Sequence, residues 1–111
     1  MYNYVMLIGR LCQDVEVQET SNGKCFSRIT LAIQRPFKNG ETNEYDTDFI
    51  PITVFDALCD IAQAHLHKGD LIGVKGRLDS NNVELKSGAK LNALNIIAER
   101  IMFISQKEKN D

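Results

Sequence analysis

The sequence predicts a small all-β barrel of five strands, with one short helix between the third and the fourth. Two observations lead to this class. Apolar residues alternate with polar ones along several segments, which is the period of a strand, and only one segment shows helical spacing. A chain of 111 residues suits one domain with a modest core. We expect that domain over residues 1–105 and a frayed, charged end over 106–111.

The first expected strand, Tyr4 to Leu11, is apolar on both faces. Val5 and Leu7 share one face, and a second apolar set occupies the other. A strand that is apolar on both sides is usually covered on both sides. In so small a domain, another subunit is a natural second cover. The residues expected at that subunit interface are Tyr4, Met6 and Ile8.

The second expected strand runs from Cys25 to Ile33, and the polar segment 38–47 after it reads as a hairpin loop with Asn39-Gly40. Pro36 should end this strand or confine it to an edge, because proline has no amide proton to donate. The alternation predicts two sets of side chains. The inward set is Ile29, Leu31 and Ile33, and the outward set is Arg28, Thr30 and Ala32.

The third expected strand, Asp48 to Phe55, carries the most informative pattern. Ile50, Ile52 and Val54 occupy the even positions and should face the core. Successive side chains point to opposite faces, so the odd positions face outward. These outward residues are Phe49, Thr53 and Phe55.

A short helix is expected over Ala57 to His67, with Asp56 as its N-cap and Gly69 as its C-cap signal. Helical spacing places five residues on one face. They are Leu58, Ile61, Ala62, His65 and Leu66.

The fourth expected strand, Leu71 to Leu78, points Ile72, Val74 and Leu78 inward and Lys75 and Arg77 outward. Gly76 leaves an inward position nearly empty, which indicates a bend or close packing.

A polar loop is expected over Asp79 to Lys90, before a final strand from Leu91 to Ile104. The apolar parity of that last strand shifts along its length, so we expect a β-bulge near Glu99.

Three strands, a helix and two strands is the order of an OB-fold, a Greek-key barrel that binds oligonucleotides, although other small barrels share it. Outward phenylalanines near cations suit the stacking of unpaired bases, since every base has a π-face. The pattern of residues 34–55 alone leaves a second reading open, in which these aromatics cover a second small core or a subunit interface.

Enzymatic and metal chemistry are not indicated. His65 and His67 are two residues apart, on different faces of the expected helix, and no cysteine completes a zinc set. Asp46 and Asp48 share a strand face without an accompanying base or nucleophile. No glycine-rich phosphate loop is present. We therefore expect a non-enzymatic module with no cofactor, no metal and no small-molecule substrate.

Composition limits where in the cell the protein is expected and which partners it is expected to bind. The formal net charge of −2 gives no global attraction to nucleic acid, so any basic surface must be local. No run is apolar enough to span a bilayer, and no secretory signal is recognised. Three cysteines without CxxC spacing are typical of reduced thiols. These features predict a cytoplasmic protein without a membrane partner; its association with the nucleoid is implied only by the family resemblance described next.

Several segments together resemble the bacterial single-stranded DNA-binding protein family. They are NYVMLIGRL, NGK with TLAIQRPFKN, DTDFIPITVF and HKGDLIGVKGRL, in that order, and the likeness covers roughly residues 3 to 104. The resemblance implies an OB-fold homotetramer that binds unpaired DNA during replication, recombination, repair or DNA uptake. Its stacking aromatics match Phe37, Phe49 and Phe55. The remaining DNA-binding residues expected on the outward face are Arg35, Lys38, Thr53, Lys75 and Arg77.

The sequence departs from the family pattern at two places. The loop after Leu78 carries Asp79 and Val83 where relatives have cations and an aromatic. The acidic C-terminal peptide of the family is missing, so the sequence reads as a short form or a truncated chain.

Two alternatives to DNA binding by stacking remain open. One is a primosome-type accessory protein that acts mainly through protein contacts, and the other is an oligomeric structural protein with its outer aromatics buried between subunits.

Overall fold

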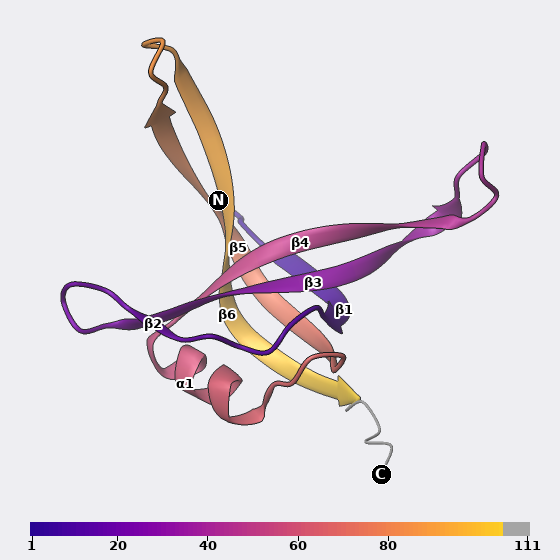
Figure 1. Ribbon diagram of the computed structural model, residues 1–111, viewed down its shortest axis with the longest axis horizontal. Helices are drawn as coiled ribbons and strands as arrows, with labels where there is room; N and C mark the ends of the chain where they lie inside the picture. The colour runs from indigo at the N-terminus through magenta and orange to yellow at the C-terminus, as the bar shows by residue number, and fades with distance from the viewer. Residues whose placement is uncertain (106–111) are drawn as a thin grey trace.

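The computed structural model describes residues 1–105, and it forms a closed barrel from which two long hairpins project (Figure 1). The strand order is β1-β5-β6-β4-β3-β2, and pairing of β1 with β3 closes the barrel. The predicted OB-fold is confirmed: β2 is only a two-residue addition, and the helix follows the third long strand. The elements are β1 (Val5–Leu11), β2 (Gln18–Glu19), β3 (Cys25–Lys38), β4 (Tyr45–Phe55), α1 (Asp56–His65), β5 (Leu71–Glu84) and β6 (Lys90–Ser105).

The core consists of side chains from the inner faces of the long strands and from one side of α1. The predicted alternation of β3 and β4 is confirmed, since Ile29, Leu31, Ile52 and Val54 are fully buried. Burial of one such side chain stabilises the fold by roughly 1.5–3 kcal/mol. The other buried apolar residues are Leu11, Cys59, Ala62, Leu66, Ile72, Val74 and Ala98.

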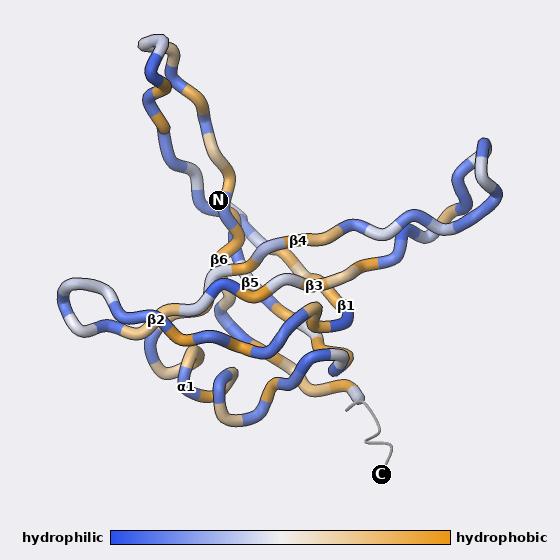
Figure 2. The backbone as a smooth tube through the Cα atoms, viewed as in Figure 1, coloured by the Kyte–Doolittle hydropathy of each residue, from blue (hydrophilic) through white to orange (hydrophobic). Residues whose placement is uncertain are grey.

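Two hairpin arms, β3–β4 and β5–β6, extend well beyond the barrel (Figure 1). The predicted loops 38–47 and 79–90 are too long, because pairing extends to Lys38 and Tyr45 in one arm and to Glu84 and Lys90 in the other; the turns are only 39–44 and 85–89. Pro36 does not end β3. The strand continues past it to Lys38, with a register shift between Gln34 and Lys38. The tip of the β3–β4 arm is strongly polar (Figure 2).

Leu78 corrects the prediction for the fourth long strand. It was expected to face the core, but its side chain is 42% exposed. The alternation itself holds, because Leu78 lies opposite Ile96 in the β5–β6 ladder. At this point β5 has left the barrel and entered the arm, so its inner face has little core to cover. Strand parity gives the side of the sheet and not the depth of burial.

The seam between β5 and β6 is tightly packed at Gly76. A Cβ atom added to Gly76 would overlap the carbonyl oxygen of Ile97, which confirms the close packing inferred from this glycine. Lys75 pairs with Arg100 and Gly76 pairs with Ala98, so Glu99 is the extra residue of the predicted bulge.

The helix differs from its prediction at both ends. Asp56 is the first helical residue and not the N-cap: its φ is +52°, Phe55 occupies the cap position, and no side chain caps the helix. Aspartate tolerates this left-handed conformation better than most residues, and it turns the chain sharply out of β4. The helix ends at His65, and Gly69, with φ +93°, serves a separate turn before β5.

The inward face of α1 is also rotated from the predicted one. Cys59 and Ala62 are buried, whereas Ile61 and His65 are exposed. His65 packs edge-on against Phe103, with 6.1 Å between ring centroids, and does not enter the core. A short helix crossing the barrel end buries a narrow stripe, so Cys59 takes the place that helical spacing gave to Ile61.

Within residues 1–105 the cysteines are free thiols, and burial raises the pKa of both Cys25 and Cys59. The described residues include no helix that is long and apolar enough to cross a membrane. The end expected to fray, 106–111, lies outside the described residues.

We expect Gly76→Ala to destabilise the barrel by roughly 1–3 kcal/mol, the usual penalty for overpacking, because the new methyl group meets the backbone of β6 and not a side chain that is able to move. Gly40→Ala is the matched control, since nothing lies within 4 Å of its added Cβ. Thermal unfolding followed by circular dichroism measures both. Equal melting temperatures for the two variants would show that the seam is not tightly constrained.

Candidate functional site

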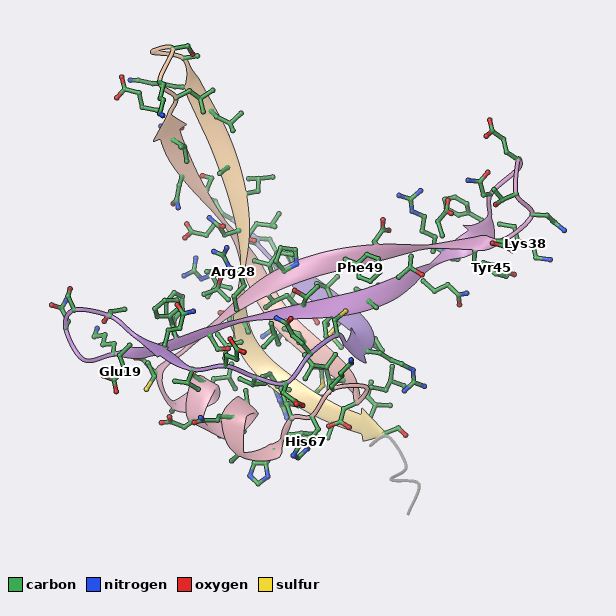
Figure 3. The ribbon with its side chains drawn as sticks, viewed as in Figure 1. Glu19, Arg28, Lys38, Tyr45, Phe49 and His67 are labelled. Carbon is green, nitrogen blue, oxygen red and sulfur yellow. The ribbon has the colours of Figure 1, made fainter. Side chains whose placement is uncertain are left out.

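Exposed phenylalanines mark the outer face of the β3–β4 hairpin. Phe49 is 67% exposed and Phe55 is 42% exposed, although their neighbours Ile52 and Val54 are fully buried. Phe49 lies midway along the arm (Figure 3), opposite Ala32, and Phe55 lies opposite Phe26 at the barrel. The aromatics predicted to point off the core therefore do so. Exposing two such rings would cost hydrophobic free energy that a stacked ligand recovers.

A row of outward side chains crosses four strands at the level of Thr53. The β-ladders place Thr53 opposite Arg28 on β3 and beside Ile97 on β6. Ile97 in turn lies opposite Arg77 on β5. Directly opposed residues point to the same side of a sheet. The row therefore carries a hydroxyl and an apolar side chain in the middle and an arginine at each end.

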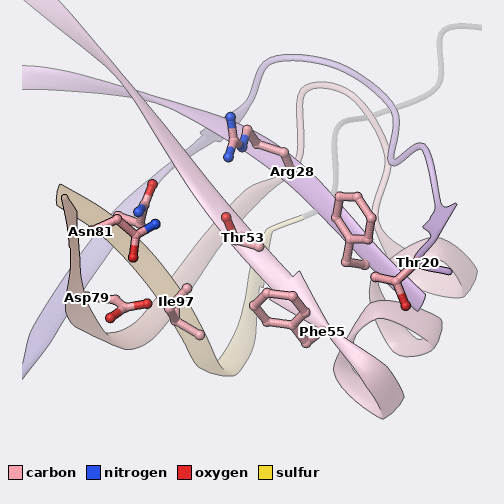
Figure 4. A pocket seen from close by; sticks show the side chains of 9 residues that line it. Thr20, Arg28, Thr53, Phe55, Asp79, Asn81 and Ile97 are labelled. Atoms are coloured by element: carbon pink, nitrogen blue, oxygen red, sulfur yellow. The ribbon is translucent and has the colours of Figure 1, made fainter. Parts of the chain in front are cut away.

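A groove of about 310 Å³ lies along this row (Figure 4). Its aromatic wall is formed by Phe26 and Phe55, whose ring centroids are 6.4 Å apart at an angle of 40°. Ile97 and Thr53 contribute from the middle of the row, and Arg28 closes one side. Two further grooves share lining residues with this one: Phe26 and Arg28 also line the first, and Arg28 and Thr53 also line the second. The remaining residues of the central groove are Thr20, Asp79, Asn81 and Asn95.

Arg35 corrects the prediction of a free cation beside the phenylalanines. Its guanidinium donates to both carboxylate oxygens of Asp48, at 3.0–3.2 Å, and lies 4.0 Å from Asp46. Asp48 lies opposite Ile33 and belongs to the inner side of the arm, away from Phe49. The hydrogen bond from Arg35 lowers the pKa of Asp48. Arg35 is thus held by two acids on the side of the arm opposite to Phe49.

The two predicted lysines stand over tyrosine rings. The amine of Lys38 lies 5.8 Å from the ring centroid of Tyr45, near the tip of the β3–β4 arm (Figure 3). The amine of Lys75 lies 5.6 Å from the ring centroid of Tyr4. Lys75 pairs with Met6 on β1, so it belongs to the β1 face and not to the row that carries Thr53.

Phe37 is 64% exposed, but its link to the other phenylalanines is weaker than predicted. It follows the register shift between Gln34 and Lys38, so strand parity no longer ties its direction to that of Phe49. It adds an exposed aromatic near the end of the arm, separate from the groove around Phe55.

Arg28 and Phe26 are the site residues that sequence reasoning missed. Alternation placed Arg28 outward, but nothing nearby in the sequence distinguished it from an ordinary surface charge. Only the pairing of β3 with β4 brings it beside Thr53. Within residues 1–105, the side chains of Arg28 and Arg77 make no hydrogen bond or ion pair, unlike that of Arg35, so both are free to bind an anion.

The face of β1 that was predicted to meet another subunit is exposed in the single chain. Tyr4, Met6 and Ile8 are 40–50% exposed. The ends of Met6, Met102 and Ile104 gather over Gly73, where an added Cβ would lie 3.3–3.7 Å from each. Among the described residues, Val5 to Ile8 pair with β5 alone, while β3 pairs with β1 only at Arg10 and Leu11. Both an apolar face and a strand edge are therefore uncovered here.

The described part of the chain contains no group of three or more histidine, cysteine or acidic residues able to hold a metal ion. His65 and His67 are both exposed, and Asp46 and Asp48 are engaged by Asn39 and Arg35. The site is thus an outer surface of aromatic rings, arginines and small polar groups, which is suited to binding.

Comparison with known proteins agrees with this architecture. Residues 2–104 match the single-strand binding protein family. "Single-stranded DNA-binding protein 1" of Staphylococcus aureus is 39% identical over 111 residues, which are all of this chain and 70% of that protein. "Single-stranded DNA-binding protein 3" of Listeria innocua is 38% identical over 108 residues, covering 97% of this chain and 67% of that protein.

A solved structure shows the same fold. It is described as "Plasmodium falciparum SSB complex with ssDNA", and it superposes with a TM-score of 0.76 over 95% of this chain and 96% of that one, at 24% identity. The match along nearly the whole chain decides the family, as the sequence motifs predicted. The chain belongs to the single-strand binding protein family.

Proposed function

We propose that this protein binds single-stranded DNA, by stacking bases on Phe37, Phe49 and Phe55 and by holding phosphates with nearby cations. The observation that carries the proposal is the row from Arg28 to Arg77, which sets two free arginines across four strands beside the exposed ring of Phe55. The names of the relatives and the solved complex on the same fold support the same ligand. Stacking reads no base edges, so binding along most of the strand tolerates any sequence.

Unpaired DNA fits this surface better than duplex DNA does. The rings of Phe49 and Phe55 offer faces to bases, and paired bases hide their own faces inside the helix. Titration of the protein with single-stranded and duplex oligonucleotides of equal length, at one salt concentration, tests the proposal. We expect strong binding of the single strand only, and equal affinities would contradict it.

The cations divide into three groups by their present contacts. Arg28 lines the groove with Phe55, and Arg77 ends the row on β5; both side chains are unengaged within residues 1–105, so they are the first candidates for phosphate ligands. Lys38 and Lys75 keep their ammonium groups accessible over tyrosine rings and add contacts further out. Arg35 contributes least, because a phosphate must displace the carboxylate of Asp48.

We also propose that the protein works as a homotetramer in the cytoplasm, at the nucleoid, protecting single strands during replication, recombination, repair or DNA uptake. Self-association is supported by the apolar β1 face around Met6 and by the open edge of Val5 to Ile8. Backbone groups on such an edge are ready to pair with another strand. The number four comes from the family resemblance.

Phe49→Ala and Phe55→Ala should each weaken single-strand binding by ~1–3 kcal/mol, the range for losing one base–aromatic stack. Both rings are exposed, so the melting temperature should change little. Fluorescence anisotropy with labelled oligonucleotides measures the affinity. Ile61→Ala is the matched control, since it removes an exposed apolar side chain from α1, outside the groove. Loss of folding in either phenylalanine variant would refute the strand parity that places Phe49 and Phe55 on the outer face.

Arg28→Gln should reduce the slope of log affinity against log salt by about 0.7, the contribution of one neutralised phosphate on a single strand. Arg35→Gln should change this slope less, because Asp48 already engages its guanidinium. The salt series is measured with one oligonucleotide for all three proteins. A larger loss for Arg35→Gln than for Arg28→Gln would contradict the assignment.

Met6→Lys should weaken self-association, because it places a charge on the apolar face that covers Gly73. Ile61→Lys, at a similarly exposed apolar residue of α1, should leave the assembly intact. Multi-angle light scattering gives the molar mass of each variant. A monomeric unsubstituted protein at micromolar concentration would refute the assembly itself.

A further inference from the structure

A second row of outward side chains crosses the barrel at the level of Phe49, and it ends on an exposed arginine of β1. The β3–β4 ladder places Phe49 opposite Ala32, and the β1–β3 ladder places Ala32 opposite Arg10. Directly opposed residues point to the same side of a sheet, so the side chain of Arg10 leaves the sheet on the same face as the Phe49 ring. Two strand spacings separate the backbones of these two residues, which is about 10 Å.

The guanidinium of Arg10 is oriented by the protein without being neutralised. Its Nη1 atom donates a hydrogen bond of 3.0 Å to the carbonyl oxygen of Gly69, an acceptor without formal charge. In the part of the chain that the structure describes, no carboxylate forms an ion pair with Arg10, whereas Asp46 and Asp48 hold Arg35. A guanidinium has five N–H donors, and the bond to Gly69 uses one of them. Arg10 is therefore held in place and still available for an anion.

A groove of about 370 Å³ lies beside Arg10, where β1 and β3 separate beyond their two paired residues. Ala32 lines it between Arg10 and the strand that carries Phe49, and its single methyl group keeps this part of the row low. Gln34 and Thr47 lie opposite each other in the ladder, both exposed, and they add an amide and a hydroxyl group. Among the described residues that line this groove, none is acidic. The remaining lining residues are Ile8, Gly9, Ile33 and Leu71.

The Phe49 row is separate from the row that carries Thr53. Arg28 and Thr53 lie four residues from Ala32 and Phe49 along their strands, a distance of about 13 Å. Arg28 therefore lies near Phe55, whereas Arg10 lies across the sheet from Phe49. Each row combines an exposed aromatic ring with an arginine of its own.

We propose that Arg10 holds the phosphate of the nucleotide whose base stacks on Phe49, so that the bound strand passes over Ala32 into the groove beside β1. The inference rests on the proposed single-strand binding, and it adds one phosphate ligand and a course for the strand. Hydrogen bonds from a guanidinium to a phosphate are charge-assisted and stronger than neutral ones. Gln34 and Thr47 donate to the same stretch of sugar-phosphate backbone from the far end of the groove.

A double-substitution cycle tests whether Arg10 and Phe49 hold the same nucleotide. Arg10→Gln, Phe49→Ala and the double variant are titrated with one labelled oligo(dT) at one salt concentration. Once the base no longer stacks, its phosphate is no longer held over Arg10. We therefore expect the double variant to lose less affinity than the product of the two single losses, by roughly threefold or more, as for other coupled pairs. Arg28→Gln combined with Phe49→Ala is the matched contrast, and there the two losses should multiply.

A salt series separates a phosphate contact from a structural role of Arg10. Arg10→Gln should lower the slope of log affinity against log salt by about 0.7, the share of one phosphate on a single strand. Arg10→Lys keeps the charge and should keep the slope, so an equal fall in both variants would mean a structural defect and overturn the inference.

The other outcomes are equally decisive. An unchanged affinity in Arg10→Gln, or losses that multiply with Phe49→Ala, would overturn the inference and leave the proposed function standing. A lower molar mass of Arg10→Gln in light scattering would place Arg10 between subunits and overturn it as well. Failure of the unsubstituted protein to bind the oligonucleotide would overturn the proposed function itself.

Discussion

The close approach of β5 and β6 at Gly76 is the constraint on which the rest of this structure depends. Without a side chain at Gly76, the strand lies against the carbonyl of Ile97. The bulge at Glu99 then turns β6 so that Ile97 meets Thr53 in the parallel pairing with β4. This pairing sets Arg28 and Arg77 at the two ends of one row. The groove beside Phe55 is thus a consequence of how the barrel closes.

Much of this arrangement could be predicted from sequence, because strand parity is a local property. The alternation of Ile52 and Val54 with Phe49 and Phe55 follows from covalent geometry and survives into the folded chain. The bulge near Glu99 was visible as a change of parity. Parity does not report where a strand leaves the barrel, which is why the exposure of Leu78 was missed.

Contacts between strands could not be predicted from the sequence, because they depend on strand register. The register of β3 with β4 brings Arg28 beside Thr53, and it brings Arg35 within reach of Asp48, which pairs with it on the side of the arm away from Phe49. The register shift before Lys38 likewise separates the direction of Phe37 from that of Phe49. At the helix start, Asp56 adopts a left-handed conformation where a conventional N-cap was expected.

Under the proposed function, local electrostatics reconcile an acidic protein with a polyanionic ligand. The formal net charge is −2, yet the cations differ in availability: Arg35 is paired with acids, whereas Arg28 and Arg77 are unpaired within residues 1–105 and lie at the two ends of the row that carries Thr53. On this proposal, affinity for single strands depends on a few arginines at the aromatic surface. Salt screens the charges that lie more than about 10 Å from this surface at ordinary ionic strength.

The most direct test of this account is photocrosslinking of the protein to a single strand that contains 5-bromodeoxyuridine, with the crosslinked residues identified by mass spectrometry. The account predicts crosslinks on the outer face of β3 and β4, centred on Phe49 and Phe55, and at the groove residues of β5 and β6. Crosslinks confined to α1 or to the β1 face around Met6 would contradict it.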